Sequence, residues 1–273
     1  MARTPARGKG KPERRGRDRP RAHDLSLFPS PDSVLSPHYY YVTQRPWPSL
    51  LFILPMLIVF EVGTYLRRGV GVGNDTQLVA EYLIHWLVQR FGTTSVYLPG
   101  LLAVVILLAW HVAGRHPWRF DPFVLPGMLG ESLLWSAPLF VFNNVLHTAL
   151  FGGSEGAHRV WIDRIVLSCG AGLYEELVFR LICITGLVIL LIDVCKLPRT
   201  AAGVFIAFAS ATLFAAHHHP PLGDAPYHPV DFLFRTAAGL YLAGLFIFRG
   251  FGIAAGCHAL YNVIAVTIKA VGA

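Results

Sequence analysis

The feature that most constrains this chain is a series of long apolar stretches, each ended by basic residues, prolines or glycines. The first, SLLFILPMLIVFEVGTYL at residues 49–66, is followed by Arg67 and Arg68. A helix needs about twenty consecutive apolar residues to cross a bilayer. The chain is 54% hydrophobic and 14% charged, whereas soluble domains carry about 25% charged residues. The sequence therefore predicts an all-α, polytopic membrane helix bundle and argues against a soluble enzyme with apolar core helices.

The apolar stretches predict about eight transmembrane helices, and no internal repeat relates them to one another. We expect seven of them at about residues 49–66, 97–113, 127–147, 161–181, 201–218, 230–248 and 251–270. A further helix is expected between residues 181 and 195, after a short break. The segment Thr76–Phe91 mixes apolar and polar side chains, which favours an amphipathic helix at the membrane interface.

Composition divides the chain into three regions. Residues 1–46 form a tail rich in Pro, Gly and Arg, which carries much of the net charge of +7 and is expected to be disordered. Residues 47–159 supply the first transmembrane helices, and residues 160–270 form the predicted catalytic helix core. The tail lacks the apolar segment of a signal peptide. Nucleic-acid binding is one interpretation of its charge, but we favour a signal that keeps the N-terminus cytosolic and close to anionic lipid.

The basic turns between the helices do not agree on a topology. A cytosolic N-terminus places Arg115 and Arg119 on the cytosolic side, as the positive-inside rule requires. With eight helices, the same alternation places Lys196 and Arg199 outside, against the rule. The sequence therefore leaves open the side of the membrane to which a site would open.

Ionisable residues inside apolar helices are costly, so each is a candidate for function. The second half of the chain contains a cluster of them in three apolar stretches. The stretches read GAGLYEELVFRL with Glu175, Glu176 and Arg180; SATLFAAHHH with Ser210, Phe214, His217, His218 and His219; and GCHALYN with His258 and Asn262. We interpret Glu131, Asn143 and Asn144 of an earlier helix as candidates for lining a cavity.

Helical spacing sorts these residues into faces. Glu176 and Arg180 are i,i+4 neighbours in the order that favours an ion pair. Glu175 points about 100° away from Glu176 and is left free for another role. Two further faces carry residues spaced four apart, Ser210–Phe214–His218 and His258–Asn262.

Three helices thus each offer a polar face, and small residues allow those helices to approach one another. Gly170, Ala171 and Gly172 precede the glutamates by about one turn. A carboxylate with two histidines can bind a metal ion or activate water without one, and an Asn amide can donate to an oxyanion. Together these groups can hydrolyse an amide bond.

The three motifs resemble those of the CPBP (CAAX protease and bacteriocin-processing) intramembrane proteases, which include the type II CAAX prenyl endopeptidases. The motifs are EExxxR at Glu175–Arg180, FxxxH at Phe214–His218 and HxxxN at His258–Asn262, and the resemblance covers about residues 160–268. It implies an endopeptidase with its site inside the membrane. The order of the motifs and their placement on separate apolar helices both match the family.

The resemblance also implies roles for individual residues. Glu175 would be the general base on the attacking water, helped by His218, while His258 and Asn262 would stabilise the oxyanion. Glu176, Arg180 and Phe214 would give structural support. A divalent metal such as zinc, if required, would be held by Glu175, His218 and His258. The sequence lacks the zinc signature HExxH and leaves both metal-dependent and metal-independent hydrolysis open.

One departure from the family pattern is the run of three histidines where the motif asks for one. His218 has the FxxxH spacing, whereas His217 and His219 point elsewhere on an extended helix. Because Pro220 and Pro221 follow at once, we expect His217 and His219 to cap a helix end that faces water. Additional metal ligands are the alternative interpretation of these two histidines.

The substrates implied by the resemblance are membrane-anchored or membrane-inserted peptides and proteins. They include prenylated C-terminal tails, bacteriocin or pheromone precursors and sorting-tag segments. One alternative is a non-catalytic immunity or scaffold protein of the same family, in which Glu175 would be dispensable. Another is a proton- or metal-coupled transporter, for which we would expect inverted repeats with paired broken helices.

Overall fold

The computed structural model describes residues 37–69, 78–89, 98–119, 121–151 and 161–271. Every regular element within these ranges is helical, which confirms the predicted fold class. The elements are α1 (Pro37–Thr43), α2 (Pro46–Gly69), α3 (Val79–Gln89), α4 (Leu98–Ala113), α5 (Val124–Phe151), α6 (Trp161–Glu176), the π-helical η1 (Leu177–Ile184), α7 (Thr185–Val188), the π-helical η2 (Ile189–Val194), α8 (Arg199–Ala216), α9 (Pro229–Arg249) and α10 (Phe251–Val271).

Six helical stretches among the described residues are long and apolar enough to cross a membrane. They are Pro46–Leu66, Val124–Leu146, Trp161–Val194, Arg199–Ala216, Pro229–Arg249 and Phe251–Ile268, and α4 is a shorter apolar helix. Large apolar side chains such as Val62, Leu134 and Phe205 are exposed on the outside of the bundle. An apolar exterior of this kind suits contact with lipid tails, so the chain is a multi-pass integral membrane protein.

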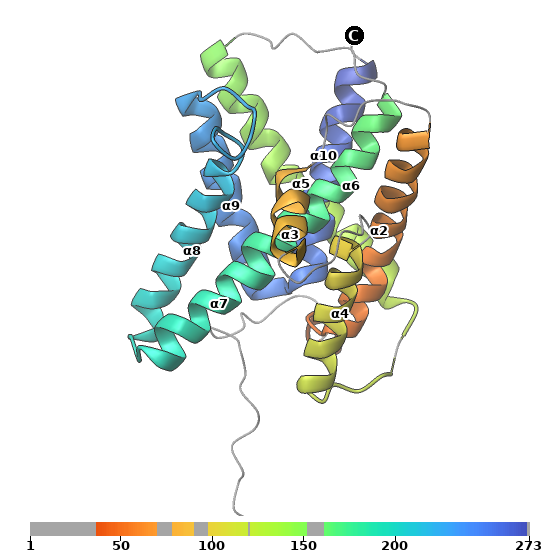
Figure 1. Cartoon of the computed structure of the whole chain (residues 1–273), viewed down its shortest axis with the longest axis vertical. Coiled ribbons are helices and arrows are strands. Elements are labelled where there is room, and N and C mark those ends of the chain that lie inside the picture. The colour runs from red at the N-terminus through yellow and green to blue at the C-terminus, as the bar shows by residue number, and fades with distance from the viewer. Residues whose placement is uncertain (1–36, 70–77, 90–97, 120, 152–160, 272–273) are drawn as a thin grey trace, which may run out of the picture.

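The predicted break between a fourth and a fifth helix is wrong. α6, η1, α7 and η2 form one continuous helix from Trp161 to Val194. The stretch contains no proline, and Gly186 does not interrupt it. The helix ends at Val194, and beyond it Lys196 adopts a positive φ of 56° shortly before Pro198. At 1.5 Å per residue, 34 residues span roughly 50 Å. This length exceeds the hydrocarbon core, so the helix must tilt, and Figure 1 shows it crossing the bundle obliquely.

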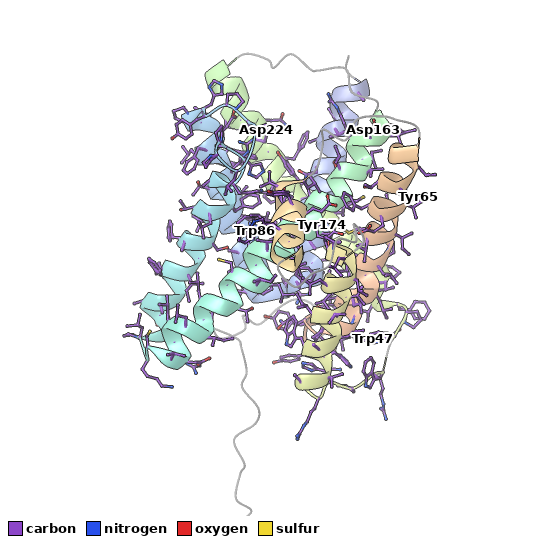
Figure 2. All side chains as sticks on the ribbon, viewed as in Figure 1. Trp47, Tyr65, Trp86, Asp163, Tyr174 and Asp224 are labelled. Atoms are coloured by element: carbon purple, nitrogen blue, oxygen red, sulfur yellow. The ribbon has the colours of Figure 1, made fainter. Side chains whose placement is uncertain are left out.

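This oblique helix and α10 form the centre of the bundle. α10 packs against α6 and α5, and α2 packs against α6, α4 and α10. α8 and α9 pack against each other on the opposite side from α2 and α4 (Figure 1). Figure 2 shows Tyr174 of α6 in the middle of the bundle, where its hydroxyl donates to Oε1 of Glu61 on α2 at 2.7 Å.

The N-terminal region differs in part from its prediction. Most of the expected disordered tail, residues 1–36, lies outside the described residues, but Pro37–Thr43 within it form helix α1. The predicted amphipathic segment contains helix α3, with Ala80 and Ile84 buried and Tyr82 and Trp86 exposed. α3 packs against α4 and α6.

Candidate active site

Glu175 and Glu176 are the last two residues of α6, at the point where the helix widens into the π-helical η1. Two glycines bring neighbouring helices close to this point. A Cβ on Gly172 would lie 2.6 Å from the backbone nitrogen of Ala259 in α10, and a Cβ on Gly170 would overlap the Phe60 ring. The small residues therefore bring the two glutamates to α10, as the sequence predicted. π-helical turns occur frequently at functional sites.

The Glu176 carboxylate is the centre of a fully buried network. Its Oε1 forms an ion pair with Nη1 of Arg180 at 3.1 Å and accepts a hydrogen bond from Nδ1 of His258 at 2.8 Å. The Arg180 guanidinium also donates to the Gly239 carbonyl at 3.2 Å and lies 4.3 Å from the centre of the Phe214 ring. Because both Glu176 and Arg180 are 0% exposed, this network fixes the positions of α6, α8, α9 and α10 relative to one another.

Glu175 faces the other way and meets three imidazoles. Its Oε1 lies 3.7 Å from Nε2 of His217 and 4.0 Å from Nε2 of His218, and its Oε2 lies 3.7 Å from Nε2 of His258. The carboxylate is 8% exposed. The structure thus brings Glu175, His218 and His258 together, as the spacing of the motifs predicted, and adds His217.

The hydrogen bonds of the three imidazoles determine which of their nitrogens carries the proton. Nδ1 of both His217 and His218 contacts the Phe214 carbonyl, and Nδ1 of His258 contacts the Glu176 carboxylate. These oxygens accept hydrogen bonds, so each Nδ1 is the donor. In the neutral rings, Nε2 then presents a lone pair to Glu175.

His218 lies just beyond the membrane-spanning part of α8, and its environment favours the neutral ring. Burial lowers the pKa of His218 to about 4, although the nearby Glu175 carboxylate acts in the opposite direction. At neutral pH, His218 therefore has a free lone pair on Nε2.

His217 follows the last residue of α8, as expected of a helix end, but the prediction that His217 and His219 face water there is wrong. His217 is 2% exposed and His219 is 5% exposed. α8 ends at Ala216, and the next amides bond to carbonyls three residues back, His218 to Ala215 and His219 to Ala216. This tighter turn changes the direction of the side chains from that on an α-helix. The rings of His217 and His218 therefore lie side by side, with centroids 3.9 Å apart.

His219 has a different role, because both of its ring nitrogens are engaged away from Glu175. Nδ1 donates to the Ala225 carbonyl at 3.0 Å, and Nε2 lies 3.3 Å from Nη1 of Arg235. The ring also contacts Tyr227 edge-on. His219 therefore ties the loop between α8 and α9 to α9.

A cavity of about 280 Å³ reaches the site from between α5, α8, α9 and α10. Its lining consists of Leu139, Asn143, Phe214, His218, Asp231, Phe234, Arg235, Ala238, Leu242, His258, Tyr261 and Asn262. Asn262 therefore faces the same space as the two histidines. Of the earlier candidates, Asn143 does line the cavity, whereas Glu131 forms an ion pair with Arg249.

The residues expected to bind a metal are only partly those that lie closest together. Among the described residues, the ligand atoms of Glu175, His217 and His218 lie within 4.8 Å of one another. His258 faces the second carboxylate oxygen, Oε2, instead. His217, which the sequence spacing placed elsewhere on the helix, therefore completes this group.

Part of the chain matches a known protein family. Residues 157–264 match the family model described as type II CAAX prenyl endopeptidase Rce1-like. This part of the chain is an Rce1-like domain. The family resemblance drawn from the three motifs is thereby confirmed. Searches of the curated proteins and of the solved structures found no match.

The Rce1-like domain contains each motif and almost all of the cavity wall. It runs from just before α6 into α10 and contributes every lining residue except Leu139 and Asn143 of α5. The match of residues 157–264 to this family supports an intramembrane protease of the CAAX type.

Proposed function

We propose that this protein is an intramembrane endopeptidase that hydrolyses a peptide bond of a membrane-associated protein or peptide. The observation that carries the proposal is the Glu175 carboxylate, which is surrounded by Nε2 atoms of three imidazoles at 3.7–4.0 Å beside a cavity. The match of residues 157–264 to the Rce1-like family supports the same class of reaction.

Glu175 is assigned as the general base. Separations of 3.7 and 4.0 Å between its Oε1 and the Nε2 atoms of His217 and His218 are longer than a hydrogen bond. They allow one water oxygen to lie about 2.8 Å from both the carboxylate and an imidazole. The water would donate one hydrogen to Glu175 and the other to His218, which faces the cavity. As the water attacks the scissile carbonyl carbon, Glu175 takes its proton, and it returns this proton to the leaving amine nitrogen when the C–N bond of the tetrahedral intermediate breaks.

His258 and Asn262 are assigned to the carbonyl oxygen of the scissile bond, where negative charge develops. Both line the cavity, one helical turn apart. Asn262 brings an N–H of its own, and His258 brings one when Nε2 is protonated. Glu176 fixes the orientation of His258 through Nδ1, and Arg180 and Phe214 hold Glu176 and the histidine rings in place.

The continuous helix supports a proposal for the orientation in the membrane. Figure 1 shows the end of α4 and the turn between η2 and α8 at the same, lower end of the bundle. These two turns carry the exposed residues Arg115, Arg119, Lys196 and Arg199. With one helix instead of two, the basic turns no longer conflict, so we propose that this end faces the cytosol.

A defined peptide can test the proposal with purified protein. We would incubate the full chain in detergent micelles with a farnesylated peptide that ends in a CAAX tail, and with the same peptide lacking the farnesyl group. Mass spectrometry in ¹⁸O-labelled water would detect a new carboxylate that contains one labelled oxygen. We expect cleavage by the wild-type protein and none by Glu175→Gln.

Two results would contradict parts of this account. Equal cleavage by wild type and Glu175→Gln would remove Glu175 from the chemistry. Cleavage of neither peptide by a correctly folded wild-type protein would reject this substrate class and favour a non-catalytic immunity or scaffold role.

A further inference from the structure

We infer that Arg235 of α9 and Tyr261 of α10 form a subsite that binds a carboxylate of the substrate close to the scissile bond. The inference rests on the proposed function and deepens it, because it names a chemical group that a substrate of this site should carry. The starting observation is that both side chains line the cavity that also contains His218, His258 and Asn262.

Arg235 is a cation in a position where a cation is costly. It belongs to α9, one of the helices that are long and apolar enough to cross a membrane, and it lines the cavity. Of the described residues in the cavity wall, Arg235 is the one with a permanent positive charge. Charged side chains that face a cavity within a membrane bundle are candidates for contact with the substrate.

A hydrogen bond to His219 fixes the direction of the guanidinium. Nδ1 of His219 donates to the Ala225 carbonyl, so Nε2 of the same ring is an acceptor. Nη1 of Arg235 donates to this Nε2 at 3.3 Å. The contact uses one of the five N–H donors of the guanidinium, and a neutral imidazole does not cancel its charge.

Tyr261 supplies a second donor from α10, which packs against α9. It lies one helical turn from His258 and within electrostatic range of Arg235. A carboxylate accepts hydrogen bonds at two oxygens, and a guanidinium matches this geometry with two parallel N–H groups. A guanidinium and a phenol hydroxyl in one cavity therefore suit a carboxylate group of a peptide.

The subsite lies close to the proposed general base. Arg235 is within electrostatic range of Glu175. On α9, Arg235 comes one turn before Gly239, about 6 Å along the axis, and the Gly239 carbonyl accepts from Arg180 of the Glu176 network. An extended peptide advances about 3.3 Å per residue. We therefore expect the bound carboxylate about two residues from the scissile bond.

The charge of Asp231 opposes that of a substrate carboxylate. Asp231 lines the cavity one turn before Arg235 and interacts with it electrostatically. It lies in the first turn of α9, where a negative charge is stabilised by the helix N-terminus. Removal of this charge in Asp231→Asn should therefore increase the preference of the cavity for an acidic peptide.

Peptide binding can be measured without cleavage. We would use full-length Glu175→Gln protein in detergent micelles and measure Kd for three fluorescently labelled, farnesylated peptides by anisotropy. One ends in a free carboxylate, one in a carboxamide, and one in a carboxamide preceded by an aspartate next to the last residue. A hydrogen bond to a charged group contributes roughly 10–100-fold to binding, so the peptide without a carboxylate should bind that much more weakly.

The two acidic peptides separate the sources of the carboxylate. A preference for the free acid assigns the subsite to the C-terminus of the substrate, and a preference for the aspartate peptide assigns it to an acidic side chain. In the same Glu175→Gln background, Arg235→Gln should remove the preference, and Tyr261→Phe, which loses only a hydroxyl, should reduce it.

His219→Gln is the matched control for a purely structural role of Arg235. It breaks the same hydrogen bond between the loop and α9 but keeps the cation, so it should retain the preference for a carboxylate. Arg235→Lys covers the case in which Arg235→Gln does not fold, as judged by gel filtration and thermal melting. Because lysine keeps the charge but not the paired N–H groups, it should retain a smaller preference.

The inference is overturned if the Glu175→Gln protein binds all three peptides equally or binds none of them. It is also overturned if Arg235→Gln keeps the full preference, or if His219→Gln loses it to the same extent as Arg235→Gln. Cleavage by wild type that is indifferent to the carboxylate refutes this inference alone. Binding that depends on Arg235 in a protein that cleaves nothing refutes only the proposed function.

Discussion

Asn262 and Asn143 line the same cavity from different helices, but only Asn262 lies one turn from His258. If Asn262 donates to the oxyanion, Asn262→Ala should lower kcat by about 10²–10³-fold, with a smaller change in KM. Asn143→Ala is the matched control and should leave kcat almost unchanged. Both would be measured on a peptide that the wild-type protein cleaves. An equal loss for the two variants, or none for either, would contradict the assigned role.

Most of the individual site residues could be predicted from spacing, because spacing on a regular helix determines direction. Glu176 and Arg180 do form an ion pair, Glu175 is separate from it, and His218 and His258 both reach Glu175. The position of His217 beside Glu175 was not predicted, because the spacing rule assumes that the helix continues. α8 ends at Ala216, one residue before His217, and the tighter turn that follows brings His217 beside His218. The hydrogen bond from His258 to Glu176 joins two helices, and no local sequence pattern predicts such a tertiary contact.

At the scale of elements, the site depends on how closely α6 approaches α10. A Cβ on Gly172 would lie 2.6 Å from the backbone of Ala259, one residue after His258. Since backbone atoms cannot move aside cheaply, Gly172→Ala should push the helices apart and separate Glu175 from His258. We expect a lower melting temperature in detergent and reduced cleavage.

Gly186 provides the control for this prediction, because it lies in the same continuous helix. A Cβ there has no neighbour within 4 Å, so Gly186→Ala should keep wild-type activity and melting temperature. If Gly172→Ala also behaved like wild type, the close contact between α6 and α10 could not be what positions the site.

The lengths of the elements were harder to predict than their existence. Hydrophobicity alone located the apolar stretches, but it could not show that the helix from Trp161 to Val194 is unbroken, since a bilayer requires only about twenty residues. The widened π-helical turns in η1 and η2 also left no signal that we could identify in the sequence.

At the scale of the whole molecule, the continuous helix determines the proposed orientation. Cys195 is exposed beside Lys196, whereas Asp224 is exposed in the loop between α8 and α9, and Figure 2 labels Asp224 at the upper end of the bundle. A membrane-impermeant maleimide should therefore label Cys195 in inverted vesicles but not in intact cells, and Cys195→Ser should abolish this labelling.

A second cysteine reports from the opposite end. In the Cys195→Ser background, Asp224→Cys should be labelled in intact cells. The reverse pattern for the two cysteines would place the basic turns outside and contradict the proposed orientation.

The most direct test of the central claim is a comparison of peptide termini in membranes that contain wild type, Glu175→Gln or Glu61→Gln. Glu61 is a suitable control because it is another carboxylate within a membrane helix, and it accepts from Tyr174 rather than facing the histidines. All three proteins must first reach the membrane in equal amounts. We predict that a defined set of cleaved termini present with wild type and Glu61→Gln disappears with Glu175→Gln. Identical termini for all three would contradict catalysis by Glu175.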